Sequence, residues 1–306
     1  MPRRFLFFLT IVFLSSHLLA QDSLQTVVAE PGDGIFSILR KQGVYPKKYY
    51  EAFLKLNEGH IKNGSELKQG WAYKIPDAPD SFKKMGRAVS LPSGDETPLF
   101  ETELAKLDLK SEELKDAVYY LIVEDSVQNQ DFVSTIATNL ASRLLVNGAK
   151  VYVIKVMDET LKKNEMALLQ QYVDVVNKRY LKNQGKYQRL LLLRSNGTFQ
   201  GKNLDLAFYH HDGSNEGQRL ADNLEMIFTR NSKKVVTVEN SQDVLKNKGN
   251  LFLAKNILPA ITVLSISDSK AKSKEGKLIV RKDQKAMTQM IAKGMFQDYA
   301  DLEIEE

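Results

Sequence analysis

Few side chains in this sequence could hold a metal or act as a nucleophile. The chain has no cysteine and four histidines, so it offers no thiolate zinc ligand, no disulfide and no cysteine nucleophile. His17 and His60 lie far along the chain from the adjacent pair His210 and His211. Neighbouring residues of a strand point to opposite faces, so that pair is not expected to bind one metal together. The sequence also lacks a Gly-x-Ser-x-Gly elbow, a Walker loop and a His-Glu-x-x-His motif.

The first residues of the chain predict a secretory signal peptide over residues 1–20. A short basic region at Arg3 and Arg4 precedes an apolar run, and small residues lead to Ala20. The run is too short to span a bilayer core comfortably, and no later segment is long and apolar enough to do so. We therefore expect cleavage after Ala20 and no transmembrane anchor afterwards. The mature protein is expected in the periplasm or outside the cell, associated with the cell envelope.

Composition limits the class of protein and its partners. The chain is 43% hydrophobic and 26% charged, which is typical of a globular protein, and its 306 residues suggest about two domains. The formal net charge is +5, and part of it lies in the signal segment. Because the remaining positive charge is mild and no basic cluster is interleaved with aromatic residues, nucleic acid is not an expected partner.

Residues 26–76 predict a compact first domain in the order strand, helix, helix, strand. A β-type run at 26–29 leads to a turn in which Asp33 can cap the first helix. Pro46 opens a second helix, since proline is favoured in the first helical turn. Residues 71–75 are expected to form the closing strand.

The rest of the sequence predicts a second, larger domain. Residues 77–112 have the prolines and small polar residues of a linker, without a periodic apolar face. From 113 to 297, apolar runs such as 117–123 alternate with amphipathic helices, and residues 298–306 are predicted as an acidic tail. We therefore predict an α/β protein: a small strand-helix-helix-strand domain, then a mostly parallel sheet with helices on both faces.

The first domain resembles a LysM domain. The matching stretches are Pro31-Gly32-Asp33, Leu54 to Asn57, and Leu67 to Pro76. This resemblance implies binding of peptidoglycan or a related chitooligosaccharide-type glycan, in a groove between the loop after the first strand and the loop after the second helix. Carried over by position, the glycan-binding residues are Gly32, Asp33, Gly34, Ile35, Phe36, Asn57, Glu58, Gly59, His60 and Ile61. A simpler interpretation, compatible with binding, is that Asp33 caps a helix and Asn57 forms a turn.

The second domain resembles the zinc-dependent N-acetylmuramoyl-L-alanine amidases of the cell wall, over residues 113–297. The stretches that carry the resemblance are 117–123, 136–156, 187–193, 206–210 with the helix at 218–228, and 259–266. In that family two histidines and one glutamate bind the zinc, and a further glutamate does the acid–base work. The resemblance therefore implies a metal site at the ends of the strands.

None of the four side chains implied by this resemblance is present. The first histidine falls nearest Asp125, and the glutamate ligand falls near Asn129. The second histidine falls on Arg194, whose permanent positive charge repels zinc, and the catalytic glutamate falls on Leu264 or Ser265. We therefore expect a degenerate zinc site, with no catalytic residue, metal or cofactor in this domain.

Arg194 suggests what has replaced the metal. An ion pair with Glu124, Asp125 or Asp131 would hold the loops together at the former zinc position; the plainer alternative is a solvated arginine at a strand end. The sequence thus favours a peptidoglycan-binding pseudoenzyme that scaffolds or regulates cell-wall remodelling, with a cell-wall hydrolase as a possible partner. Two alternatives stay open: an active amidase with an unorthodox site, and a structural envelope protein whose second domain contacts only proteins.

Overall fold

The computed structural model describes residues 24–61, 66–92, 94–129, 131–156, 163–231, 248–268 and 278–305. The predicted signal segment and His17 lie outside these residues. The chain divides into two compact units, one comprising Met1–Leu39 and Pro46–Ala78 and the other comprising Arg40–Tyr45 and Pro79–Glu306. No helix of the described residues is long and apolar enough to cross a membrane.

The first unit has the predicted order of elements. Strand β1 (Thr26–Val28) is followed by helices α2 (Ile35–Lys41) and α3 (Pro46–Leu56) and by strand β2 (Ala72–Lys74). The two strands pair antiparallel, with Val28 opposite Ala72. The unit's core is made of the apolar side chains that face inward from these elements, including Ile35, Ile38, Leu39, Phe53 and Tyr73.

The second unit is built on one eight-stranded sheet with the strand order β10-β8-β9-β7-β5-β6-β3-β4. The five central strands are parallel: β9 (Ala260–Asp268), β7 (Tyr187–Asn196), β5 (Ala117–Glu124), β6 (Lys150–Val156) and β3 (Gly86–Leu91). Antiparallel strands complete both edges: β4 (Glu96–Pro98) on one side, and β8 (Asn203–His210) and β10 (Leu278–Arg281) on the other. The predicted mostly parallel α/β sheet is confirmed.

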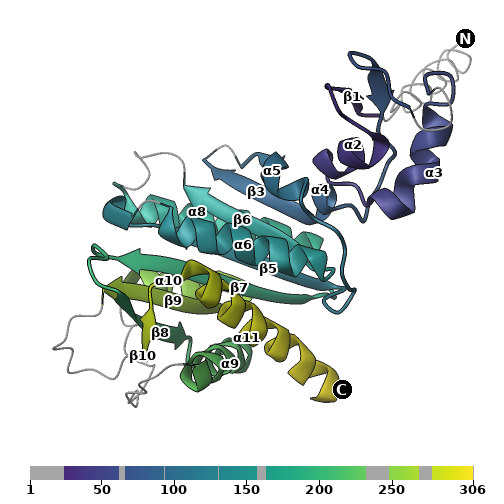
Figure 1. Ribbon diagram of the computed structural model, residues 1–306. Coiled ribbons are helices and arrows are strands. Elements are labelled where there is room, and N and C mark those ends of the chain that lie inside the picture. The colour runs from purple at the N-terminus through teal and green to yellow at the C-terminus, as the bar shows by residue number, and fades with distance from the viewer. Residues whose placement is uncertain are drawn as a thin grey trace, which may run out of the picture. The chain divides into compact units, whose positions relative to one another are not determined.

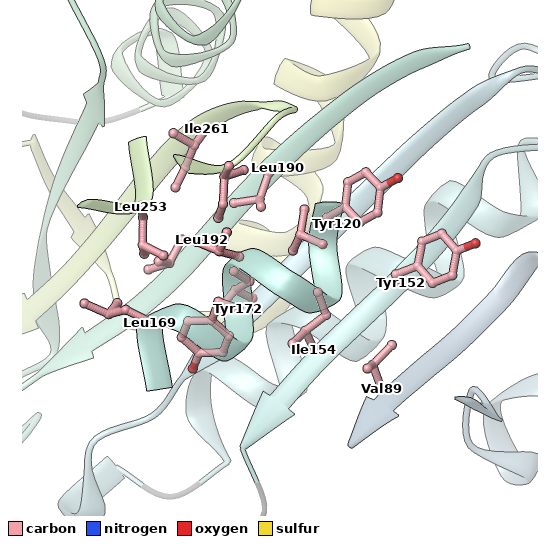
Figure 2. Packing of buried hydrophobic residues seen from close by; sticks show 14 of the residues in the cluster. Val89, Tyr120, Tyr152, Ile154, Leu169, Tyr172, Leu190, Leu192, Leu253 and Ile261 are labelled. Carbon is pink, nitrogen blue, oxygen red and sulfur yellow. The ribbon is translucent and has the colours of Figure 1, made fainter. Parts of the chain in front are cut away.

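Helices cover both faces of this sheet, as the alternation of buried strands and amphipathic helices predicts (Figure 1). Helix α11 (Gln284–Glu305) packs beside α6 (Phe132–Val146) and α9 (Asn215–Asn231). Helix α8 (Glu165–Lys182) packs beside α10 (Lys248–Asn256). Figure 2 shows the core on the side of α8 and α10, where Leu169, Tyr172 and Leu253 meet the strand residues Tyr120, Leu190 and Leu192.

The predicted linker over residues 77–112 is wrong, because most of it belongs to the second unit's fold. It contains the short helices α4 (Phe82–Met85) and α5 (Glu101–Leu104), and between them strands β3 and β4. Strand β3 pairs parallel with β6 along its whole length. Polar residues interrupt the apolar pattern of β3, so its sequence alone does not indicate a strand. The pairing with β6 supplies the stability of this strand.

The predicted acidic tail over residues 298–306 is also wrong in its structured part. Helix α11 runs on to Glu305, and the Asp298 side chain is completely buried. Its carboxylate accepts hydrogen bonds from Arg189 Nε at 3.0 Å and Arg219 Nε at 2.7 Å, and also from the Tyr187 hydroxyl. A buried carboxylate is stable only when it is paired and hydrogen-bonded, and this one is both.

Candidate functional site

The carboxyl ends of strands β5 and β7 form the first candidate site. From β5 the chain continues through α6 to β6 on one side, whereas the chain from β6 crosses through α8 to β7 on the other side. The strand order therefore reverses at the β5–β7 boundary, and the carboxyl edge at such a switch point is where open α/β sheets bind ligands. Glu124 and Arg194 stand opposite each other at this boundary.

Arg194 holds this edge together through two hydrogen bonds. Its Nε donates to the Glu124 carboxylate at 2.5 Å, and its Nη1 donates to Asn250 Oδ1 of α10 at 3.0 Å. The Arg194 and Glu124 side chains are 23% and 21% exposed, so the pair is mostly withdrawn from water. Of the partners considered for Arg194, Glu124 is the one it contacts.

Tyr172 belongs to the core shown in Figure 2, and its hydroxyl is near enough to Glu124 and Arg194 to interact with both charges. Burial raises the pKa of its hydroxyl well above the ordinary value of 10.0, and the neighbouring Glu124 charge raises the pKa further, while Arg194 lowers it. The hydroxyl therefore stays protonated at physiological pH. The Tyr172 side chain thus contributes a neutral, buried phenol to the core next to the Glu124–Arg194 pair.

Asp125 is used as a helix cap. Its carboxylate accepts hydrogen bonds from the backbone N–H groups of Val133 and Ser134, at 2.8 and 2.9 Å, and from the Ser134 hydroxyl at 2.6 Å. These amides belong to the first turn of α6, where the helix leaves its N–H groups without internal partners and favours negative charge. Both carboxylate oxygens are therefore occupied in holding the start of α6.

Asn129 joins the loop after β5 to the loop after β7. Its side-chain amide donates to the Gly197 carbonyl and to Ser126 Oγ, and its Oδ1 accepts from the backbone N–H of Phe199 at 2.9 Å. Ser126 adds a second link, because its backbone N–H donates to Ser195 Oγ at 2.6 Å. The two loops are thus fixed to each other by hydrogen bonds.

The remaining positions implied by the amidase resemblance bring no metal ligand to this edge. Leu264 is fully buried in β9, beside Leu193 of β7. His210 and His211 lie at and just after the end of β8, where His211 Nδ1 accepts from the Gly213 N–H at 3.0 Å. Within the described ranges, no group of three or more His, Asp or Glu side chains is placed to hold a metal ion. The arginine, the capping carboxylate and the buried leucine do not fit a zinc ion.

A cavity of about 550 Å³ lies beside this edge. Lys282 Nζ lies 6.0 Å from the ring centroid of Phe132 and 5.7 Å from that of Phe199, and it donates to the Phe199 carbonyl at 3.0 Å. The cavity is lined by Gln128, Asn129, Asp131, Phe132, Thr135, Thr198, Phe199, Lys282 and Gln284. The lining combines amide, hydroxyl, ammonium and carboxylate groups with two aromatic rings.

The second candidate site is at one end of the first unit's two strands. Because β1 and β2 are antiparallel, the loop that leaves β1 and the loop that enters β2 meet at the same end. The loop after β1 is shaped by Gly32, whose φ of +83° favours glycine, and by Asp33. The Asp33 carboxylate accepts from the Glu30 N–H at 3.0 Å and from Ser37 Oγ at 2.9 Å.

Two of the predicted glycan-binding residues serve the fold of this unit. Asn57 is 2% exposed. Its Nδ2 donates to the backbone carbonyls of Phe53 and Lys74, both at 2.9 Å, and its Oδ1 accepts from the Lys74 N–H at 2.8 Å. Ile35 is buried in the core. Both residues position the loops and present nothing to a ligand.

The other predicted residues leave an accessible surface. Gly32, Gly34, Phe36, Glu58, Gly59 and His60 are exposed, and Asp33 and Ile61 are half-buried. A Cβ atom built on Gly34 or Gly59 would have nothing within 4 Å, so the backbone there is open to an approaching molecule.

Trp71 is a residue of this surface that sequence reasoning missed. Its ring lies 5.5 Å from the His60 ring, at an angle of 85°, and it is 37% exposed. The predicted closing strand covered residues 71–75, whereas β2 covers Ala72–Lys74 and leaves Trp71 just before it. The preceding Lys68-Gln69-Gly70 turn was a usable signal, because it places Trp71 directly after a turn and not in the middle of a strand.

Comparisons with known proteins give weak structural likenesses. No protein-family model matches the sequence, and no curated protein matches it. A metallo-carboxypeptidase from Pseudomonas aeruginosa, in complex with (2-guanidinoethylmercapto)succinic acid, is similar with a TM-score of 0.38 and 11% identity; the alignment covers 60% of this chain and 58% of that one. The catalytic domain of CwlV, an N-acetylmuramoyl-L-alanine amidase from Bacillus (Paenibacillus) polymyxa var. colistinus, is similar with a TM-score of 0.34 and 16% identity, over 60% of this chain and 98% of that domain.

The chain thus spans less than two thirds of the carboxypeptidase that it matches. Both TM-scores are low, and neither likeness carries a functional assignment to this chain. The functional argument depends on the geometry of the two candidate sites.

Proposed function

We propose that this chain is an exported peptidoglycan-binding protein of the cell envelope, in the periplasm or outside the cell. Its first unit binds the glycan, and its second unit is a non-catalytic platform that scaffolds or regulates cell-wall remodelling. The observation that carries the proposal is the pair of loops at one end of β1 and β2, which combine open glycine backbone with exposed aromatic side chains.

These loops have the chemistry that a glycan chain requires. Sugars offer hydroxyl and acetamido groups, which backbone N–H and C=O groups can bind, and flat C–H faces, which apolar and aromatic side chains can cover. Gly34 and Gly59 allow a ring to approach the backbone closely. Phe36, two residues after Gly34, is 44% exposed, and its ring centroid lies 5.3 Å from that of Tyr50, so it adds an apolar surface next to the first loop.

The arrangement at the carboxyl edge of the second unit supports a non-catalytic role. Arg194 and Glu124 neutralise each other, and Asp125 is occupied by the start of α6. A hydrolase acting on an amide needs an activated water or a nucleophile, together with a group that stabilises the developing negative charge. The interactions at this edge provide rigidity, which fits a platform for a stem peptide or for a cell-wall hydrolase.

Sedimentation with purified peptidoglycan sacculi tests the glycan-binding proposal. The full mature chain is expected in the pellet, and Gly34→Gln and Gly59→Gln are expected to weaken binding, because the added side chains occupy space that a sugar needs. Ala52→Gln is the matched control, since Ala52 is exposed within α3 and belongs to neither loop. Wild-type protein that stays in the supernatant would refute glycan binding, and equal binding by all four proteins would refute the assignment of the glycan site to these two loops.

A further inference from the structure

Trp71 is the only tryptophan in the chain, and its placement is unusual for so large an apolar side chain. It is 37% exposed, whereas Phe53 and Tyr73, the large aromatic residues of the same unit's core, are completely buried. Part of the Trp71 ring is therefore open to solvent, where an approaching ligand can cover it.

The backbone on both sides of Trp71 is firmly held. Its carbonyl accepts from the Ala29 N–H at 3.0 Å, and the Gly70 N–H donates to the Ala29 carbonyl at 2.8 Å. The Trp71 N–H donates to the Lys68 carbonyl at 3.2 Å, closing the turn before β2. Trp71 is therefore fixed next to the residue from which the loop after β1 departs.

The indole ring reaches the other loop. It meets the His60 ring nearly perpendicularly, with 5.5 Å between the ring centroids. Trp71 thus connects the two loops proposed to hold the glycan, because its backbone bonds to Ala29 at the start of the loop after β1 and its ring contacts His60 at the start of the loop that enters β2. An aromatic ring fixed at two points loses little conformational entropy when it binds a ligand.

The position of Lys68 shows which kind of group the indole face attracts. Lys68 Nζ lies over the ring, 4.5 Å from the centroid. The electron-rich face of an indole attracts positive charge, and the C–H bonds on the flat side of a pyranose carry partial positive charge of the same sign. Because Lys68 is exposed and an exposed cation–π contact is weak, a sugar ring can displace the ammonium group.

We propose that Trp71 is a carbohydrate-stacking residue that takes one N-acetylhexosamine ring of the glycan on its indole face, with His60 beside it as a hydrogen-bonding partner for a hydroxyl or acetamido group. This inference rests on the proposed function and extends the binding surface beyond the residues that the LysM resemblance implies. It makes Trp71 a main determinant of affinity for the glycan chain.

Tryptophan fluorescence tests the inference directly, since all tryptophan emission of the full mature chain comes from this residue. Titration with the soluble pentamer of N-acetylglucosamine is expected to change the intensity and wavelength of the emission in a saturable way. Maltopentaose, whose α-linked glucose units lack the acetamido group, is expected to leave the emission unchanged. An unchanged emission with the N-acetylglucosamine pentamer would overturn the inference.

Variants provide a second and separate readout. Trp71→Ala is expected to weaken sedimentation with sacculi by about tenfold or more, as truncation of a central aromatic residue commonly does, and Trp71→Phe is expected to keep part of the affinity. Val28→Ala is the matched control, because Val28 is 55% exposed on the paired strand, with its side chain on the other face of the two-stranded sheet. A thermal melt of each variant checks that the fold is retained.

The outcomes separate this inference from the proposed function. If wild-type protein binds sacculi and both Trp71 variants bind equally well, the stacking role is wrong while glycan binding stands. If wild-type protein does not bind sacculi at all, the proposed function fails and the inference fails with it. Loss of binding by Trp71→Ala together with an unchanged melt and a normal Val28→Ala control supports the inference.

Discussion

Replacement of Arg194 by methionine tests whether an ion pair holds the carboxyl edge of the second unit. Methionine keeps most of the apolar stem and removes the guanidinium group. The change removes the 2.5 Å hydrogen bond to Glu124 and the 3.0 Å hydrogen bond to Asn250. It also leaves the Glu124 carboxylate, which is only 21% exposed, without its positive partner.

The expected loss of stability can be bounded from these contacts. Breaking a fully buried pair by removing one partner costs about 3–5 kcal/mol, whereas exposed pairs contribute about 1 kcal/mol or less. Both side chains here are about one-fifth exposed, so water partly rehydrates the carboxylate that is left behind. We therefore expect a loss of about 2 kcal/mol, which lowers the melting temperature of a unit of this size by about 4–8 °C.

Thermal and urea unfolding of Arg194→Met, Glu124→Gln and the double variant provide the assay. The double variant is expected to lose less than the sum of the single losses, by about 1 kcal/mol, because the two side chains act through one interaction. Arg143→Met is the matched control, since Arg143 is exposed on α6 and its replacement is expected to change stability by about 0.5 kcal/mol or less. The reasoning is refuted if Arg194→Met is no less stable than Arg143→Met.

Three further predictions concern buried charge, pH dependence and metal content. Asp298→Ala is expected to cost about 3–5 kcal/mol in urea unfolding, because it leaves Arg189 and Arg219 without their shared carboxylate; a loss below about 1 kcal/mol would contradict this. Burial raises the pKa of the Glu225 carboxyl above its ordinary value of 4.5, and the Asp222 charge raises the pKa further. A folded-state pKa above the unfolded one means that ionisation destabilises the fold, so Glu225→Gln is expected to raise the melting temperature at about pH 7, with the difference vanishing as the pH falls towards about 4. An equal effect at both pH values would show that the carboxylate charge is not the cause. Elemental analysis of the purified mature protein is expected to give sub-stoichiometric zinc, and one zinc per chain would refute the ligand assignments.

The central strands of the second unit were predictable because their residues are buried on both faces. The runs at 117–123 and 189–193 are almost entirely apolar, which is the pattern of interior parallel strands. Strand β3 was not predicted, because arginine and serine interrupt its apolar residues and its stability comes from β6. Asp298 was placed in a tail because its acidic surroundings suggest solvent, and the two arginines that pair with it are far away in the sequence.

The candidate sites were predictable only in part. The chain's scarcity of histidine and the position of Arg194 suggested an ion pair in place of a metal, but the choice of Glu124 required the register between β5 and β7. Asn250, the second partner of Arg194, comes from a helix that showed no apolar period in the sequence. Trp71 was missed because it was assigned to the closing strand, whereas its N–H closes the turn with the Lys68 carbonyl and β2 begins only at Ala72.

The most direct test of the account is one incubation of zinc-supplemented mature protein with purified sacculi, followed by centrifugation. The protein in the pellet and the stem peptide in the supernatant are measured together. The account predicts that the protein is retained in the pellet and that no peptide is released above the level of a protein-free control. Release of stem peptide would contradict the non-catalytic second unit, and protein left in the supernatant would contradict glycan binding by the first.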